Sequence, residues 1–220
     1  MSAPRIALVH AMPVAIDPVA NVFRENWPDA RVTHVLDDSL PPDLEAAGSI
    51  TAAIKERFVT LARYCEGCGS DAILFTCSAF GTAIEAARDA VKIPVLKPNE
   101  AMLEEALAAG SNLALITTFE PSIPSLKMEF EELASSRGIA LKLKTRTVPA
   151  ALVALQKGLH TEHDSLIAAA AAEMGHCDAL VLGQFSAARA AAGIPKTPGR
   201  KIVTSPHSAV NRLKQILDVR

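Results

Sequence analysis

The chain has 220 residues, a formal net charge of −2, and hydrophobic side chains at half of its positions. This composition predicts a sizeable buried core and excludes an intrinsically disordered protein. Because Lys and Arg form no block, we expect neither nucleic-acid nor anionic-membrane partners. No apolar stretch approaches the roughly 20 residues of a membrane span, and the N-terminus resembles no signal peptide, so we expect a cytoplasmic protein with reduced cysteines.

Short apolar runs bounded by turn residues alternate with longer segments of helical periodicity. This alternation is typical of buried parallel strands in βαβ units. The predicted strands are, in chain order, 6–9, 32–36, 72–75, 94–96, 113–116, 141–143, 179–182 and 202–204. The covering helices that we expect include 49–64, 101–109, 123–137 and 161–174. Ser49 and Thr161 have the residue types of N-caps, and Gly110, Gly138 and Gly175 stand where helices should end.

An internal repeat runs through the chain. The segment Asp71-Ala-Ile-Leu-Phe-Thr-Cys77 matches Asp178-Ala-Leu-Val-Leu-Gly-Gln184, 107 residues further on. The same offset places 6–10 on 113–117, and an offset of 108 places 98–102 on 206–210. All βαβ proteins share some of this pattern, but three matches in the same order favour a duplication.

We therefore predict an α/β fold of two pseudo-symmetric domains, each a parallel sheet flanked by helices. The predicted first domain is 1–97 plus 205–220, and the second is 98–204. Ligands of open parallel sheets bind outside the carboxyl ends of the strands. We accordingly expect the two sheets to face each other, with an active site in the interdomain cleft.

Cys77 directly follows a predicted strand, and a helical pattern begins at about Thr82. Backbone N–H groups at a helix N-terminus lower a thiol pKa and favour the thiolate, so we expect Cys77 to react. The same N–H groups, with Thr76 and Ser78, are suited to hold a carboxylate. A buried structural cysteine is the alternative.

Other polar residues also follow predicted strands. His10 follows the first strand, where it could orient a substrate or assist proton transfer, or simply form hydrogen bonds in a loop. Thr117 and Thr118 could bind a carboxylate or cap the next helix. His207 follows the last strand, with a functional role and helix capping equally open.

Several reactive residue types have a simpler explanation. Cys65 and Cys68 form a C-x-x-C at the end of a predicted helix, without the second ligand pair of a zinc site, and we expect packed helix-end thiols. Cys177 precedes a strand and is expected to be structural. For Asp37 and Asp38 we favour a solvated turn over acid/base work.

Three further histidines lie among the predicted helix ends, and we expect them on the surface: His160, His163 and His176.

These residues resemble the aspartate/glutamate/hydantoin racemase superfamily, which includes maleate isomerase and arylmalonate decarboxylase. The resemblance covers the whole chain and rests on the repeat and on three motifs: Phe75-Thr-Cys-Ser-Ala79, Leu36-Asp-Asp-Ser-Leu40 and Thr204-Ser-Pro-His-Ser-Ala-Val210. It implies a final helix that returns to the first domain, and chemistry without metal, pyridoxal phosphate or nucleotide. It also implies two cysteines on opposite faces of the substrate: one removes the proton α to a carboxylate and the other delivers one.

The sequence departs from that pattern at the second cysteine, where Gln184 stands. An amide is no useful acid or base, and Ser186 is a poor substitute. Cys77 could work with His10 or His207 in a racemase or epimerase, donate a proton after decarboxylation, or attack as a nucleophile in maleate-type isomerisation. Arylmalonate decarboxylases carry their single cysteine at the other position. A non-catalytic binding protein and a Cys–His hydrolase are rival hypotheses.

We predict a cofactor-independent, metal-free racemase or isomerase for a small carboxylate, with Cys77 as acid/base and His10 as auxiliary. A homo-oligomer is compatible with such a scaffold. No Arg or Lys clearly marks a site for a second carboxylate, and Lys97 and Arg189 are only candidates for a position near the cleft. The residues expected to contact the substrate are Thr76, Ser78, Thr117, Thr118, Gln184, Ser186 and His207.

Overall fold

The computed structural model describes residues 3–218, and its contacts divide the chain into two compact units. The first unit runs to Glu100 and takes in the chain again from Ala209, and the second is Ala101–Ser208. Helix α9 (Ser205–Asp218) begins in the second unit and ends in the first. The chain therefore finishes in the unit in which it began.

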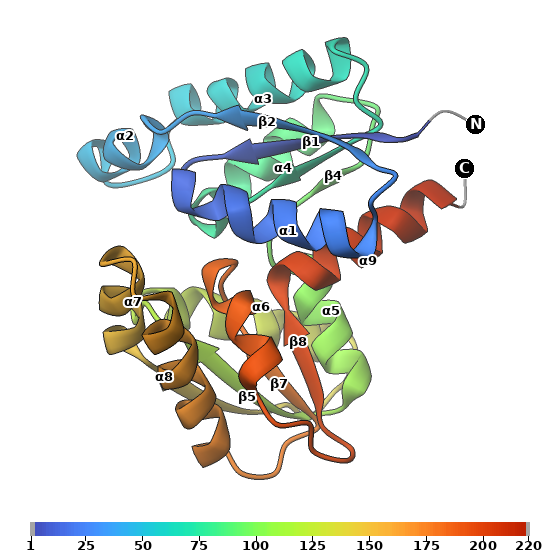
Figure 1. Ribbon diagram of the computed structural model, residues 1–220. Coiled ribbons are helices and arrows are strands. Elements are labelled where there is room, and N and C mark those ends of the chain that lie inside the picture. Colours follow the sequence, from blue (N-terminus) through green and yellow to red (C-terminus); the bar gives the residue numbers. More distant parts are fainter. Residues whose placement is uncertain (1–2, 219–220) are drawn as a thin grey trace. The chain divides into compact units, whose positions relative to one another are not determined.

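Within the described residues, the first unit holds a four-stranded parallel sheet with the strand order β2-β1-β3-β4. Helix α3 covers one face of this sheet, and α1 covers the other (Figure 1). The elements are β1 (Arg5–His10), η1 (Pro13–Ala15), α1 (Ile16–Asn26), β2 (Arg31–Leu36), α2 (Leu40–Ala47), α3 (Ala52–Gly67), β3 (Ala72–Phe75), η2 (Ser78–Phe80), α4 (Gly81–Asp89) and β4 (Val95–Leu96).

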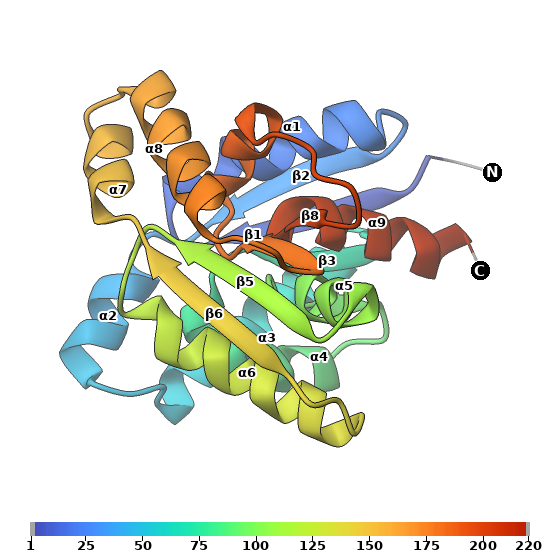
Figure 2. The same cartoon turned by 90° about the horizontal axis from the view of Figure 1, so that it is seen from below.

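The second unit repeats this arrangement, with the order β6-β5-β7-β8 among its described strands. Helices α8 and α6 lie on opposite faces of its sheet (Figure 2). The elements are α5 (Glu100–Ala109), β5 (Asn112–Thr117), α6 (Ser122–Ser136), β6 (Lys142–Thr147), α7 (Pro149–Gln156), α8 (His160–Glu173), β7 (Ala179–Leu182), η3 (Ser186–Gly193), β8 (Lys201–Thr204) and α9. The predicted α/β architecture of two similar halves is confirmed.

The sequence repeat reappears in the strand pairing. Strands β1 and β5 have the same length and lie 107 residues apart, as do β3 and β7. The register repeats as well, because Ile6 pairs with Ala72 and Leu113 pairs with Ala179. Each half therefore places its first and third strands side by side with their carboxyl ends at the same edge.

An aspartate fixes this pairing at the start of the strands in both halves. The backbone N–H of Arg5 donates to Oδ2 of Asp71 at 2.7 Å, and that of Asn112 donates to Oδ2 of Asp178 at 2.9 Å. The backbone N–H groups of the two aspartates donate in return to the carbonyl groups of Arg5 and Asn112. The predicted duplication thus extends to individual hydrogen bonds.

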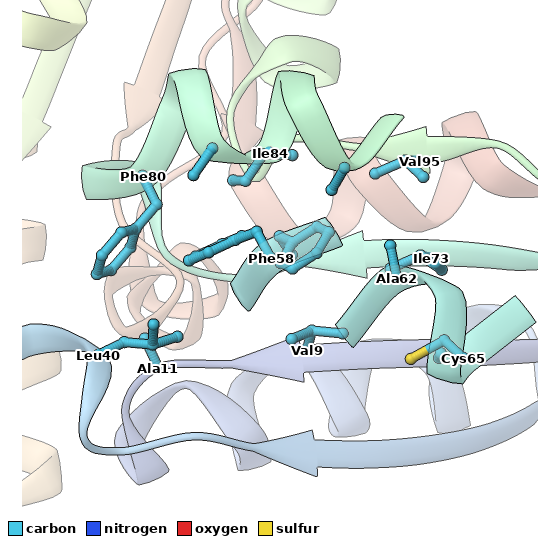
Figure 3. Close-up of a cluster of buried hydrophobic side chains, with 14 of the residues drawn as sticks. Val9, Ala11, Leu40, Phe58, Ala62, Cys65, Ile73, Phe80, Ile84 and Val95 are labelled. Carbon is cyan, nitrogen blue, oxygen red and sulfur yellow. The ribbon is translucent and has the colours of Figure 1, made fainter. Parts of the chain in front are cut away.

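The central strands are buried on both faces, which explains their continuous apolar runs. In the first unit, Val9 and Ile73 pack with Phe58, Phe80 and other side chains from α3, η2 and α4 (Figure 3). The Phe58 ring lies 5.0 Å from the Phe80 ring, measured between centroids. Among residues 3–218, no helix combines the length and apolar character that crossing a bilayer demands.

Several predicted element boundaries are confirmed and others are wrong. Strands 72–75 and 179–182 are found as predicted, and α5, α6 and α8 end just before Gly110, Gly138 and Gly175. The strand predicted at 141–143 extends instead over Lys142–Thr147, because β6 is an edge strand with mostly exposed, polar side chains.

Both predicted N-caps are also wrong. Helix α3 is capped by Thr51, whose hydroxyl accepts from the Ile54 backbone N–H, and not by Ser49. Thr161 lies inside α8, whose N-cap is Leu159.

Replacing Gly110 by Ala should destabilise the second unit by about 2 kcal/mol or more. A Cβ at this glycine would lie 2.5 Å from Cβ of Asp178, which is held in place by its backbone bonds, and the φ of 156° disfavours a side chain. Gly67→Ala is the matched control, since nothing lies within 4 Å of its added Cβ and the residue is helical. Urea denaturation measures both, and equal effects would contradict the expectation.

Candidate functional site

The carboxyl ends of β1 and β3 bring His10 and Thr76 together. Val9 pairs with Phe75, so the residue that follows each lies on the same face of the sheet. The Nδ1 atom of His10 lies 2.9 Å from Oγ1 of Thr76, and both residues are buried. Oγ1 of Thr76 also lies 3.4 Å from the carbonyl oxygen of Val9, to which it can donate.

A second histidine, His34, belongs to the same group, and it was not predicted as a site residue from the sequence. It lies on β2, where it pairs with Leu8, so its side chain is a diagonal neighbour of His10 on the same face. Its Nδ1 atom lies 3.0 Å from Nε2 of His10, and the two rings stack with their centroids 5.2 Å apart. The period-2 alternation of two adjacent parallel strands was the signal that could have revealed it.

The environment keeps this histidine pair uncharged at neutral pH. Burial, and then the charge of His34, lower the pKa of His10 from its usual 6.5 to about 4. Burial also lowers the pKa of His34, and the carboxylate of Asp17 on α1 opposes this. Because His10 is wholly inaccessible to solvent, its protonation is costly without an acceptor for each ring nitrogen.

Cys77 lies two residues beyond the end of β3, half-buried against the hydrophobic cluster of Figure 3. Burial raises the pKa of its thiol, and a hydrogen bond with the Ala79 backbone lowers it by less. The expected lowering of the pKa by a helix N-terminus is therefore wrong. The turn after Cys77 is the three-residue 3-10 helix η2, and α4 begins only at Gly81, too far along for its dipole to act.

Polar residues also gather at the carboxyl edge of the second sheet. Thr118 donates its backbone N–H and its hydroxyl to Oε1 of Gln184, at 2.6 and 2.8 Å. These donors fix the orientation of the amide, so its NH₂ group points away from Thr118 and can donate to a further partner. Thr117 is fully buried, and its hydroxyl oxygen has no hydrogen-bond partner among the described residues.

The matched strand ends of the two halves therefore carry different chemistry. Cys77 and Gln184 each lie two residues beyond a strand, β3 and β7. Where the first half joins His10 to Thr76, the second half has Thr117 and Gly183. A Cβ on Gly183 would lie 2.8 Å from a methyl group of Leu115, which accounts for the missing side chain there.

The other predicted contact residues occupy the same edges. Ser78 is exposed at the start of η2, and Ser186 is the half-buried first residue of η3. His207 lies in the first turn of α9, where its Nδ1 atom is 2.6 Å from Oγ1 of Thr204. The described hydrogen bonds thus join predicted site residues in two pairs, His10 with Thr76 and Thr118 with Gln184.

Charged residues near these strand ends form ion pairs with one another. Arg57 donates to both carboxylate oxygens of Asp37, at 2.6 and 2.8 Å. Burial raises the pKa of Asp37, but the bonds from Arg57 and Ser39 outweigh it and leave that pKa lowered. Asp37 is therefore suited to a structural ion pair rather than to proton transfer. Lys97 pairs with Glu85 at 2.8 Å.

His163 was expected at the surface, and this prediction is wrong. Its side chain is fully buried on α8, and Nδ1 lies 2.8 Å from Oδ1 of Asp164. Arg189 donates to the same carboxylate, at 2.8 and 3.0 Å. Helix packing buried this position because η3 lies against α8.

The cysteines away from the strand ends are free thiols. Cys65 is buried in the last turn of α3, Cys68 follows that helix, and Cys177 is buried before β7. Burial raises the pKa of Cys65 to about 11. Across residues 3–218, no three His, Cys, Asp or Glu side chains gather as metal ligands would.

Comparison with known proteins identifies the family of the chain. A profile of the family described as Asp/Glu/Hydantoin racemase matches residues 19–213, so the chain belongs to this family. A comparison with curated protein sequences finds no match.

Solved structures resemble the whole chain. Allantoin racemase from Klebsiella pneumoniae has a TM-score of 0.72 at 16% identity, over 98% of this chain and 88% of that one. Picrophilus torridus aspartate racemase has a TM-score of 0.68 at 14% identity, over 98% and 94%. Unliganded arylmalonate decarboxylase has a TM-score of 0.63 at 16% identity, over 96% and 92%. At these identities the likeness establishes a shared fold.

Stability should fall as the pH drops from 6.5 towards 4. The unfolded chain protonates His10 near its usual pKa of 6.5, whereas the folded chain resists protonation down to about 4. The unfolded state therefore binds more protons in this window, at a cost to stability on the order of 3 kcal/mol. Urea denaturation across this range should show a shallower pH dependence for His10→Asn than for the wild type or the exposed-site control His160→Asn. An unchanged dependence would contradict the assignment.

Proposed function

We propose that this protein is a cofactor-independent racemase or isomerase that moves a proton at the carbon α to the carboxylate of a small acid, an amino acid or a hydantoin-like compound. Cys77 is its acid/base, and membership of the racemase family supports this class of reaction. The observation that carries the proposal is the placement of a lone, half-buried thiol beyond β3, matched beyond β7 by the oriented amide of Gln184.

The protonation state of Cys77 decides how it takes part. Because burial raises the pKa of its thiol, the resting enzyme holds a proton on sulfur at neutral pH. The thiol is then ready to donate a proton to a carbanion-like centre. To act as a base it must first lose that proton, so proton abstraction by Cys77 should become faster as the pH rises.

The second unit supplies the groups that hold the substrate carboxylate. With its oxygen bound by Thr118, Gln184 can offer only its NH₂ group, which is a donor and so suits a carboxylate or carbonyl oxygen. The buried Thr117 hydroxyl, which lacks a partner among residues 3–218, is a second donor. We assign Ser78, Ser186 and His207 to substrate contact at the strand ends and His10 to an auxiliary role. In this proposal Gln184 occupies the second-cysteine position of the family.

A decarboxylase is the second candidate, because a single protonated thiol suits a reaction that needs one proton on one face. A malonate-type dianion would lose CO₂, and the electron pair of the broken C–C bond would form an enediolate with the remaining carboxylate. The S–H bond of Cys77 would then break as a C–H bond forms, and water would return a proton to the thiolate. Arylmalonate decarboxylase, whose fold resembles this one, carries out a reaction of the kind its name states.

Cys77→Ser should abolish proton exchange at the α-carbon, with a loss of at least about 10³-fold, because a hydroxyl is a far weaker acid than a thiol. Proton NMR in D₂O follows deuterium incorporation into aspartate, glutamate, hydantoin and allantoin, and CO₂ release from an arylmalonate. CO₂ release without exchange would assign the decarboxylase.

Cys177→Ser is the matched control, since that buried thiol precedes β7 at the opposite end of the sheet from the predicted site. Equal activity in wild type and Cys77→Ser would refute the role of Cys77. Binding of these compounds without turnover, unchanged in Cys77→Ser, would point to a non-catalytic binding protein.

Gln184→Glu should raise the KM for carboxylate substrates by about tenfold or more and change kcat less. A glutamate can still accept both hydrogen bonds from Thr118, but it replaces the NH₂ donor with negative charge that repels a carboxylate. Gln156→Glu, at an exposed position on α7, introduces the same charge away from the site. Steady-state kinetics separates the two, and equal KM values would rule out contact between Gln184 and the carboxylate.

A further inference from the structure

His34, His10 and Thr76 form a continuous line of hydrogen bonds from the surface of the first unit to the strand end beside Cys77. His34 is exposed on the edge strand β2, whereas His10 and Thr76 are buried. The successive distances are 3.0 Å between the two imidazoles and 2.9 Å from His10 to the threonine hydroxyl. The line therefore connects solvent to the residue that directly precedes Cys77.

Both ring nitrogens of His10 are used, which leaves two consistent arrangements of the protons. In the first, His34 donates to Nε2 of His10, Nδ1 of His10 donates to Thr76, and Thr76 donates to the Val9 carbonyl, 3.4 Å away. In the second, Thr76 donates to Nδ1 of His10, and Nε2 of His10 donates to His34. A shift of protons along the line converts one arrangement into the other.

We propose that His34, His10 and Thr76 form a proton relay between solvent and the end of β3, with His34 as its solvent-facing member. This inference rests on the proposed function, because proton-transfer chemistry at Cys77 is what gives a relay at this strand end its use. The three residues all belong to the first unit, so the relay is complete within it.

One transfer along the relay conserves protons and charge. A proton from water binds to Nε2 of His34, and the Nδ1 proton of His34 passes to Nε2 of His10. The Nδ1 proton of His10 passes to Oγ1 of Thr76, whose own hydroxyl proton leaves to an oxygen of the bound substrate. Each imidazole ring and the threonine hydroxyl gain one bond to hydrogen and lose one. One proton therefore enters at His34 for each proton that leaves at Thr76.

The charges around the outer histidine suit this role. His10 faces His34 from β1, and the carboxylate of Asp17 acts on it from α1. Asp17 favours the protonated form of His34, whereas burial keeps His10 neutral. Protonation at the outer end is thus easier than at the inner one, and a proton that reaches His10 is readily passed on.

The test measures the exchange of the His10 ring proton with water by ¹⁵N NMR, which requires no substrate. His10→Asn identifies the signal. His34→Gln retains a side chain able to form hydrogen bonds but unable to carry a proton through, so we expect exchange at His10 to slow by at least about tenfold. Free imidazole added to His34→Gln should restore much of the rate, because position 34 is exposed. The exposed-site control His160→Gln should exchange as the wild type does.

The NMR titration of His10 is a second readout. Removing the neighbouring charge of His34 should shift the midpoint of His10 upward in His34→Gln. Unchanged exchange at His10 in His34→Gln, or a slowing that imidazole does not relieve, would overturn the relay. If the wild type exchanges no α-proton of any compound in the panel, the proposed function fails while the behaviour of the His10 proton still decides the relay.

Discussion

The parallel pairing of the first strand with the third, in the same register in both halves, decides which side chains meet at the ends of the sheets. In the first half this pairing sets His10 beside Thr76, and in the second it sets the segment after β5 beside that after β7, where Thr118 reaches Gln184. Each junction lies at a carboxyl edge, the side on which open parallel sheets bind ligands. The aspartates at the opposite ends hold these registers in place.

On this shared scaffold, the two halves have acquired different polarity. The first half ends in a thiol and a pair of neutral imidazoles, all groups that can gain or lose a proton. The second half ends in an amide and hydroxyls, which donate hydrogen bonds but do not titrate there. Duplication therefore supplies the matching geometry, and substitution at a few strand ends places titratable groups in one half and non-titrating hydrogen-bond donors in the other.

Much of the fold could be read from the sequence because its determinants are local. The runs 72–75 and 179–182 are apolar throughout since both faces are covered, and the repeat located their partners. β6 was misplaced because an edge strand buries little and needs no apolar run. The direction of the pKa shift of the Cys77 thiol was predicted wrongly, because burial against a cluster that includes Phe58 and Phe80 raises this pKa. Phe58 is distant in the sequence, and Phe80 lies in the short turn η2, so the sequence did not reveal this burial. His34 was not predicted as a site residue, because only the register between β1 and β2 places it beside His10.

The bond between Thr118 and Gln184 also bears on how such a chain can evolve. Thr118 is almost completely shielded from water, and Gln184 accepts from both its N–H and its hydroxyl. A single mutation that placed a thiol at 184 would leave both Thr118 donors without an acceptor, with a penalty of about 1–3 kcal/mol per buried group. A change from Gln184 to Cys is therefore unfavourable unless Thr118 changes as well. The pair thus constrains positions 118 and 184 together, and mutations at either one are more easily kept if they preserve the hydrogen bonds.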